Sequence, residues 1–234
     1  MVIAGVDGCR GGWLCITGDP WQPAGLQARL LDAPDELAGL TPVPECIGVD
    51  IPIGLPDGEP RACDRAARAR LGRPRGSSVF PAPLRAMLVA DDYAEACRIG
   101  RERSGRALSR QAFNLLPAIA AMDRFLQSNP GFAERIHEVH PECSFQAWNA
   151  GVAMPASKKT AAGIDQRAAL IDRDYPGARA SATAQLPPRS YAPDDLLDAL
   201  AVFHTAHRIA RGIAECVPAE DHRDAHGLPM QIRV

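Results

Sequence analysis

Three aspartates in apolar surroundings are the residues of this chain best suited to carry chemistry. Asp7 follows a run rich in Val and Ile and precedes glycines, the pattern of a buried strand that ends in a turn. Asp50 lies in a second such segment, 46–51, and Asp198 lies within an apolar helix. Burying a bare carboxylate costs several kcal/mol or more. Each of the three therefore needs a cation, a set of donors or a metal.

The helix that carries Asp198 opens with the sequence PDDLLDALAVFHTAHR. Because residues three and four apart share a helix face, Asp198 lies beside Asp194 and Asp195. Asp194 and Asp195 have a simple structural explanation, since carboxylates at a helix N-terminus favour its dipole and can cap it. Asp198 has none, because it lies between Leu197 and Ala199 and next to another acid. A positive charge is expected near it.

The two strand acids and the helix acids can meet if the sheet has parallel central strands, because strand tips and a packed helix then converge. Such a cluster of carboxylates without Cys or His suits Mg²⁺ or Mn²⁺. Two ions of this kind stabilise the attacking and leaving oxygens of an in-line displacement at phosphorus. This arrangement of acids therefore indicates an enzyme that hydrolyses a phosphodiester.

The elements that must position these acids alternate between strands and helices. Strands are expected over the opening run and over 13–17, 26–31, 46–51 and 135–140, and the turn signals between the first three favour an antiparallel meander. After the fifth strand we expect a helix to about Trp148, a basic loop over 157–163 and a helix to about Arg173. The last long helix is predicted from Pro193 to about Cys216, and the terminal segment GLPMQIRV is expected to add an edge strand or to pack down.

A helical block over 57–131 separates the fourth and fifth strands. One helix is expected over 61–71, one capped by Asp91 or Asp92, and one capped by Ser109 that Pro117 should kink or split. The segment 73–83 reads as a loop. No clean linker marks this block as independent, so we expect one domain over 1–234.

The composition is that of a globular protein. Of 234 residues, 46% are hydrophobic and 23% are charged. The net charge of −2 lacks the basic excess that usually indicates nucleic-acid binding. Two arginine-rich stretches, 61–75 and 98–110, are either local basic surface or solvated helix faces. The seven cysteines are scattered and never spaced CxxC, which favours reduced thiols. With no apolar run of about 18 residues and no leader-like start, we expect a cytoplasmic protein without membrane contact.

Other residues suggest contacts with phosphate. Gly8, Gly11 and Gly12 either turn the chain or cradle a phosphate with backbone amides, as in actin-like ATPases, and Arg10 lies among them. Loop residues that suit a docked phosphate backbone, or that serve only solubility, are Ser77, Ser78, Lys158, Lys159 and Arg167. We expect His204, His207, His222 and His226 to be core or surface residues, because no third metal ligand accompanies them.

A series of motifs nearly end to end resembles one known family. The segments are VDGCRGGW, VDIPIGLP, RACDRAARARLG, SSVFPAP, EVHPECSF, SKKTAAGIDQR, DDLLDALA and GLPMQI. In this order they resemble a bacterial and archaeal family of predicted RNase H-like nucleases catalogued as a domain of unknown function. The resemblance implies an α/β fold with a mixed five-stranded RNase H-like sheet. Its first three strands would be antiparallel and the next two parallel, with the helical block inserted between strands four and five.

The resemblance to RNase H-like enzymes such as RuvC resolvases also implies roles for the acids. Asp7 would be the ligand on strand one, Asp50 the ligand on strand four, and Asp195 and Asp198 the ligands on the last helix. Glu138 and Glu142, in EVHPE, flank strand five and are candidates for an extra ligand or a base.

The hypothesis that follows is a nuclease that uses Mg²⁺ or Mn²⁺ to cut a phosphodiester in DNA or RNA. One alternative is an ATP-binding phosphotransferase or ATPase of the related actin-like fold, which needs a second phosphate loop. Another is a non-catalytic nucleic-acid binder that keeps the acids for structure. Nucleic acid is the expected partner, and a homodimer is also considered.

Overall fold

The centre of the computed structural model, which describes all residues from 1 to 234, is a five-stranded sheet in the order β3-β2-β1-β4-β5. Its strands are β1 (Ile3–Cys9), β2 (Gly12–Gly18), β3 (Gln27–Leu31), β4 (Cys46–Asp50) and β5 (Ile136–Glu138). β2 is antiparallel to both β1 and β3, whereas β4 and β5 continue the sheet in parallel from β1. The mixed sheet expected from the sequence and the resemblance is confirmed.

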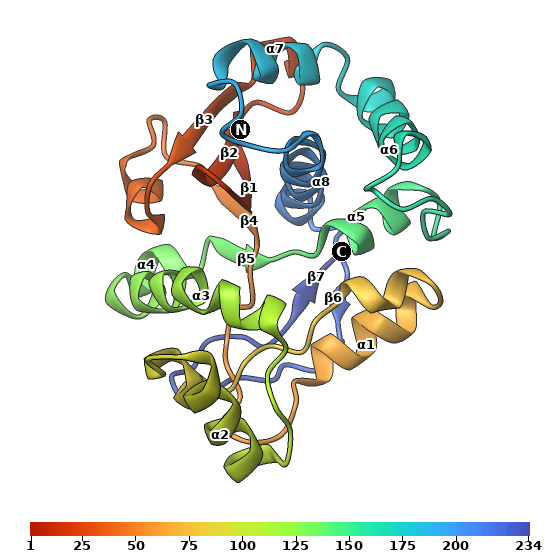
Figure 1. The fold of residues 1–234 in the computed structure, drawn as a ribbon. Coiled ribbons are helices and arrows are strands. Elements are labelled where there is room, and N and C mark those ends of the chain that lie inside the picture. The colour runs from red at the N-terminus through yellow and green to blue at the C-terminus, as the bar shows by residue number, and fades with distance from the viewer.

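Helices flank this sheet on both sides (Figure 1). Between β4 and β5 come α1 (Ala62–Leu71), α2 (Tyr93–Ser104), α3 (Arg110–Ser128) and α4 (Pro130–Ala133). After β5 come α5 (Pro141–Trp148), α6 (Ala161–Asp174), α7 (Ala178–Gln185) and α8 (Pro193–Ala210). The structure thus places helices in the interval 57–131, and the assignment of that interval as an insertion within a single domain stays a prediction.

The sheet is buried on both faces, which explains the unbroken apolar runs of its strands. On one face, Ile3 packs in a cluster with the apolar residues of α8, including Leu200 and Phe203. On the other face, Val6 packs in a second cluster with Ile119 and the following turns of α3. β1 therefore packs in one apolar cluster with α8 on one face and in another with α3 on the other face.

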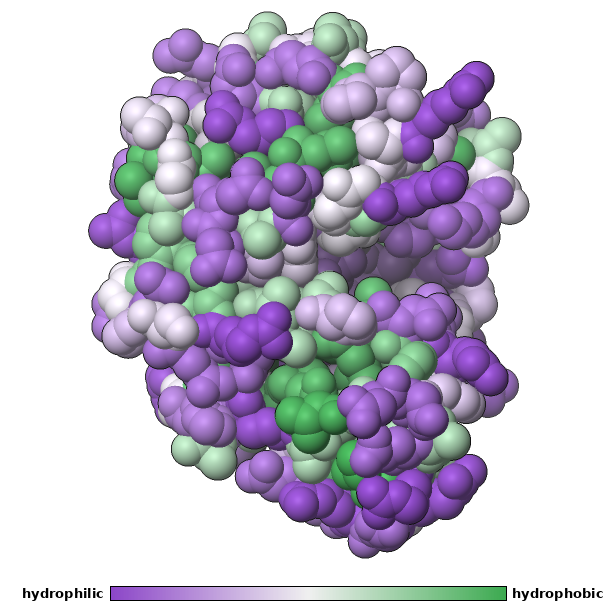
Figure 2. Space-filling view, turned by 60° about the vertical axis from the view of Figure 1, so that its left-hand side comes forward, coloured by the Kyte–Doolittle hydropathy of each residue, from purple (hydrophilic) through white to green (hydrophobic).

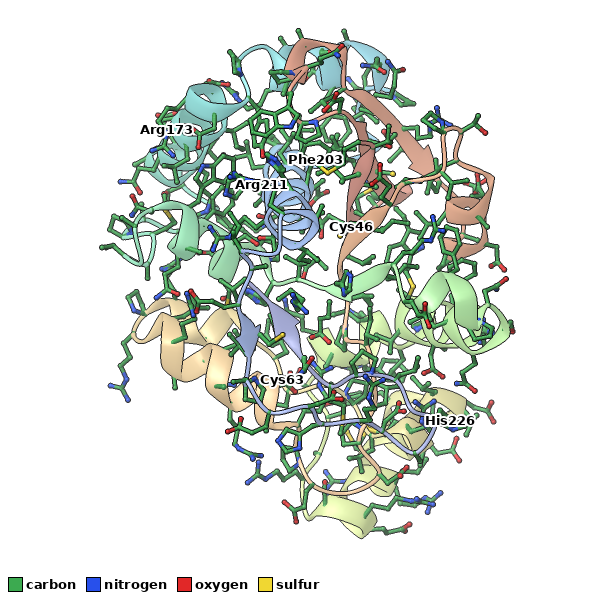
Figure 3. All side chains as sticks on the ribbon, turned by 180° about the vertical axis from the view of Figure 1, so that it is seen from behind. Cys46, Cys63, Arg173, Phe203, Arg211 and His226 are labelled. Carbon is green, nitrogen blue, oxygen red and sulfur yellow. The ribbon has the colours of Figure 1, made fainter.

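Two glycines allow α8 to approach the sheet closely. A Cβ atom on Gly5 of β1 would lie 2.2 Å from the backbone nitrogen of Phe203, and one on Gly48 of β4 would lie 2.8 Å from Val202. Figure 3 shows Phe203 on the part of α8 that lies beside the sheet. Because any side chain at Gly5 would push the helix away, this contact sets how near α8 comes to the strand ends.

Several predicted helix boundaries are confirmed, and two expectations need correction. Asp92 caps α2, and Ser109 caps α3. Pro117 does not split α3, which runs on to Ser128. The last helix ends at Ala210 rather than near Cys216, because the chain turns at Gly212 in a left-handed conformation with φ of 68°.

The terminal segment forms a small sheet of its own. β6 (Cys216–Val217) and β7 (Ile232–Arg233) pair antiparallel to each other. The seven cysteines are all free, and Figure 3 shows two of the buried ones, Cys46 on β4 and Cys63 on α1, in different parts of the molecule. None of the helices combines the length and the apolar character that crossing a bilayer requires.

Candidate active site at the strand ends

Asp7 and Asp50 occupy directly paired positions on the parallel strands β1 and β4. Burial raises the pKa of Asp7 well above its ordinary value, and the negative charges of Asp50 and Asp198 raise it further. Burial also raises the pKa of Asp50, although the charges of His140 and Lys158 oppose this shift. The pair is thus electrostatically strained without a cation.

Asp198 projects from α8 toward the same place, where the close packing at Gly5 has brought the helix. The residue is 1% exposed, and its Oδ2 accepts a hydrogen bond from Nζ of Lys158. Its Oδ1 is buried and has no hydrogen-bond partner. Burial raises the pKa of Asp198 to about 7, with Lys158 acting in the opposite direction. Asp7, Asp50 and Asp198, which we call the acid cluster, line the same cavity, and their role as metal ligands stays a prediction.

The other two acids of α8 have separate partners. Asp195 accepts a hydrogen bond at Oδ2 from the backbone nitrogen of Ala192, at 2.7 Å, and so caps its own helix. Asp194 is buried and pairs with Nζ of Lys159 at 2.5 Å and with Nζ of Lys158 at 3.9 Å. Asp195 lines the same cavity as the acid cluster, so its predicted ligand role stays open as a proposal.

Lys158 is the cation that balances the acid cluster. Burial alone would lower the pKa of this lysine, but the charges of Asp198, Asp50 and Asp7 together raise it above its ordinary value. The sequence predicted phosphate contact for Lys158 and did not predict its pairing with Asp198. Lys158 lies in the irregular segment between α5 and α6, where the sequence gives no periodic signal that would assign it an acidic partner.

The donor chemistry of the acid cluster fits a hard divalent cation. All its side chains offer carboxylate oxygens, and one of them, Oδ1 of Asp198, is buried without a partner. No group of three or more His, Cys, Asp or Glu side chains is already arranged to hold an ion. The ammonium group of Lys158 provides the positive charge among these carboxylates. An ion would therefore have to displace Lys158 and draw the carboxylates together.

Glu138 is fully engaged with the protein. Its Oε1 and Oε2 accept hydrogen bonds from the Arg61 guanidinium at 2.8 and 2.7 Å, and Oε2 also accepts one from the backbone nitrogen of Ile53. Arg61 also pairs with Asp64 at 2.5 Å. This buried network ties the start of α1 to β5, and it leaves Glu138 little capacity to bind a further ligand.

Glu142 is engaged in the same way by Arg167. Its two carboxylate oxygens accept from Nη2 of Arg167 at 2.6 and 2.8 Å. The expectation that Arg167 lies in a loop is wrong, because it belongs to α6 and its side chain is 0% exposed. Its Nη1 also donates to the carbonyl oxygens of Ala156 and Gly163. Arg167 therefore holds the segment that carries Lys158 and cannot reach a substrate.

The acid cluster opens into a cavity of about 820 Å³. Figure 2 shows the surface hollowed between the upper part of the molecule, which holds the sheet, and the lower part. Of the residues predicted to contact phosphate, Arg10, Ser78, Lys158 and Lys159 line the cavity. Ser77 does not, and the hydroxyl groups of Ser77 and Ser78 donate to backbone carbonyls of their own segment.

Two features of the site were not predicted. Asp194 contributes a buried carboxylate to the cavity, although its place in the first helical turn suggested only a cap. The opposite wall of the cavity comes from α3 and from the segment after the short helix Arg75–Ser78. It is lined by Phe80, Pro81 and Leu115 among others. Apolar residues in a loop gave no sign that they would face the acids.

The four histidines that were predicted to be core or surface residues do not line this cavity. His204 stacks on Trp148 with ring centroids 3.9 Å apart, and Tyr175 bonds both His204 and His207. His222 and His226 are exposed near the C-terminus. Neither pair faces the acid cluster.

Among the comparisons with known proteins, the family match agrees with the resemblance found in the sequence, whereas the match to a solved structure is weak. Residues 5–223 match the family described as "Protein of unknown function (DUF429)". No curated protein matches the sequence. The chain is similar to "Thermus thermophilus RuvC structure" with 17% sequence identity over 91% of this chain and 98% of that chain, at a TM-score of 0.32. So low a score carries no argument, and the RNase H-like topology rests on the strand order and directions of this chain.

Proposed function

The chain belongs to the DUF429 family, and on that premise we propose that it is a nuclease that hydrolyses a phosphodiester bond of nucleic acid with the help of Mg²⁺ or Mn²⁺. The observation that carries this proposal is the meeting of Asp7, Asp50 and Asp198 at one cavity, with a buried carboxylate oxygen left unpartnered. Acids so placed are costly to the fold. Binding a divalent cation explains why they are gathered.

In this proposal Asp7, Asp50 and Asp198 hold the ion, with Asp195 as a further ligand. When bound, the ion would polarise the phosphate and activate water for attack on phosphorus. Glu138 and Glu142 are proposed as supports, since each is held by a buried arginine. The proposal therefore uses neither of them as the extra ligand or base that the sequence analysis considered.

The cationic residues at the cavity have a second role toward the substrate. Lys159 is exposed at the rim, and Arg10 lies in the turn between β1 and β2. Both can pair with phosphate oxygens, which lowers the repulsion between an anionic strand and the acid cluster. Lys158, once displaced from Asp198, is the third such cation.

The ATP-binding alternative has less support from the glycine turn. A Cβ atom on Gly11 would lie 2.9 Å from the carbonyl oxygen of Ser190, and one on Gly12 would lie 2.3 Å from that of Leu31. Gly12 also has a φ of 122°. Close packing and turn geometry thus explain two of the three glycines, and only Gly8 faces open space.

The experiment that tests the proposed function measures cleavage of labelled single-stranded, duplex and branched DNA and RNA with Mn²⁺, with Mg²⁺ and with EDTA. Wild-type protein is compared with Asp198→Asn and with Asp172→Asn, which changes an aspartate paired with Arg179 on the surface. Metal-dependent cleavage that Asp198→Asn removes and Asp172→Asn keeps supports the proposal. Binding that survives EDTA, with no cleavage of any substrate, favours the non-catalytic binder, and ATP hydrolysis favours the ATPase.

A further inference from the structure

The cavity at the acid cluster has two chemically different sides. One side carries the carboxylates together with Lys158 and Lys159. The other side is a wall, which we call the apolar wall, formed by Phe80, Pro81, Pro83, Leu115 and Ala118. A metal site that binds only phosphate gains no binding energy from apolar side chains. The wall therefore indicates a second part of the ligand that is apolar.

Phe80, Pro81 and Leu115 of the apolar wall are exposed, whereas Ala118 is half-buried and Pro83 is buried. Phe80 is 36% exposed and Leu115 is 39% exposed. On α3 the lining residues Gln111, Asn114, Leu115 and Ala118 follow the spacing of a single helix face. This face is separate from the buried stripe of α3, which includes Leu116 and Ile119, and it combines polar with apolar side chains. Here it faces the cavity.

The chemistry of this wall fits a nucleobase. A planar base can stack on the Phe80 ring and the adjoining prolines, as bases do on aromatic side chains in single-strand binding proteins. The amides of Gln111 and Asn114 offer both donors and acceptors, which the polar edge of a base can bond. The phosphate linked to that base would then lie toward the lysines and the acid cluster.

The size of the cavity favours an unpaired strand over paired bases. A volume of about 820 Å³ is that of a small-molecule site and holds one or two nucleotides. In a duplex the base faces are stacked on one another and closed to a protein side chain. Only an unpaired strand can lay a base face on this wall while its phosphate reaches the carboxylates.

We infer that the substrate is an unpaired strand of nucleic acid, with one base on the apolar wall and the adjoining phosphate at the acid cluster. This inference rests on the proposed function for the identity of the ligand. It adds that single-stranded segments are preferred over duplex and that Phe80 is a specificity-determining residue.

The test is a binding measurement that does not depend on cleavage. Fluorescence anisotropy with a labelled 12-nucleotide strand and with its duplex, in Ca²⁺, gives the two affinities for the wild type, Phe80→Ala and Phe80→Tyr. We expect the wild type to bind the single strand about tenfold more tightly than the duplex. Phe80→Ala loses the stacking contact and should bind the strand about tenfold more weakly. Phe80→Tyr keeps an aromatic ring and should bind the strand as the wild type does. Val89→Ala, which truncates an apolar residue 81% exposed outside the cavity, should change nothing.

Equal or tighter binding of the duplex, or unchanged strand affinity in a folded Phe80→Ala, overturns the inference. The experiments distinguish a failure of this inference from a failure of the proposed function. Tight, Phe80-dependent strand binding without cleavage supports the inference and contradicts the nuclease. Metal-dependent cleavage of duplex alone supports the nuclease and contradicts the inference.

Discussion

The ammonium group of Lys158 donates a hydrogen bond to Oδ2 of Asp198, while Oδ1 of the same carboxylate stays buried without a partner. The two residues are separated by 40 positions in the chain and are brought together by the packing of α6 and α8. A lysine that neutralises a buried acid at a cavity stabilises the protein without an ion. It also competes with any divalent cation for the same carboxylate.

Replacing Asp7 by Asn should abolish metal-dependent cleavage and leave stability equal or higher. The substitution removes a carboxyl whose pKa is raised by burial and by the negative charges of Asp50 and Asp198. We expect the free energy of unfolding without metal to rise by up to about 2 kcal/mol, the range seen when a functional site is relieved of strain. Urea denaturation in EDTA measures this. Full cleavage activity in Asp7→Asn would remove Asp7 from the mechanism.

The acid cluster should make the protein without metal less stable as the pH rises. Asp198 has its pKa raised to about 7 by burial, against about 3.9 in the unfolded chain. Between those values the folded state holds more protons than the unfolded state, so the free energy of unfolding from this group falls as the pH rises. Asp198→Asn should therefore gain stability relative to the wild type between pH 4.5 and pH 7.5.

A control with the opposite sign exists on the surface. The Arg179 side chain lowers the pKa of Asp172 by a hydrogen bond, so the carboxyl is ionised in both states over this pH range, and Asp172→Asn should be less stable than the wild type by the same amount at pH 4.5 and at pH 7.5. Urea denaturation in EDTA at both pH values distinguishes the two signs. A difference for Asp198→Asn that does not change with pH would mean that its carboxyl has an ordinary pKa.

Replacing Lys158 by Met should expose its competition with the ion. The variant loses the internal counter-charge of Asp198, so its melting temperature without metal should fall. Added Mn²⁺ should then raise the melting temperature more than in the wild type, because the ion meets no competing ammonium. Lys159→Met removes the neighbouring lysine, which pairs with Asp194 instead, and should show the ordinary Mn²⁺ response. A smaller response in Lys158→Met would show that Lys158 assists the ion.

Arg167 should be essential to the fold although it never meets a ligand. Replacing it by Met leaves the buried carboxylate of Glu142 unpaired, which costs about 3–5 kcal/mol. Arg179→Met, which breaks an exposed ion pair of the same helix region, should cost about 0–1 kcal/mol. Thermal and urea denaturation compare the two. Equal losses would mean that the Arg167 pair contributes no more than a surface pair.

The sequence predicted the strands and the meeting of the acids because both depend on local patterns. Asp7 and Asp50 end apolar runs, and the buried carboxylate of Asp198 interrupts an apolar helix face. The ionic partners were not predictable, because Arg61 with Glu138 and Arg167 with Glu142 pair across 77 and 25 positions. Arginine patterning indicated only exposed positions, either a local basic surface or solvated helix faces. Only tertiary packing decides which arginines are buried.

The proposal depends most directly on whether Mn²⁺ binds among Asp7, Asp50 and Asp198. Crystals grown with Mn²⁺ and measured by anomalous scattering locate the ion without reference to activity. The account predicts an anomalous peak bound by these carboxylates, with Lys158 moved away from Asp198. Manganese bound elsewhere, or a crystal saturated with Mn²⁺ in which Lys158 still pairs with Asp198, would contradict it.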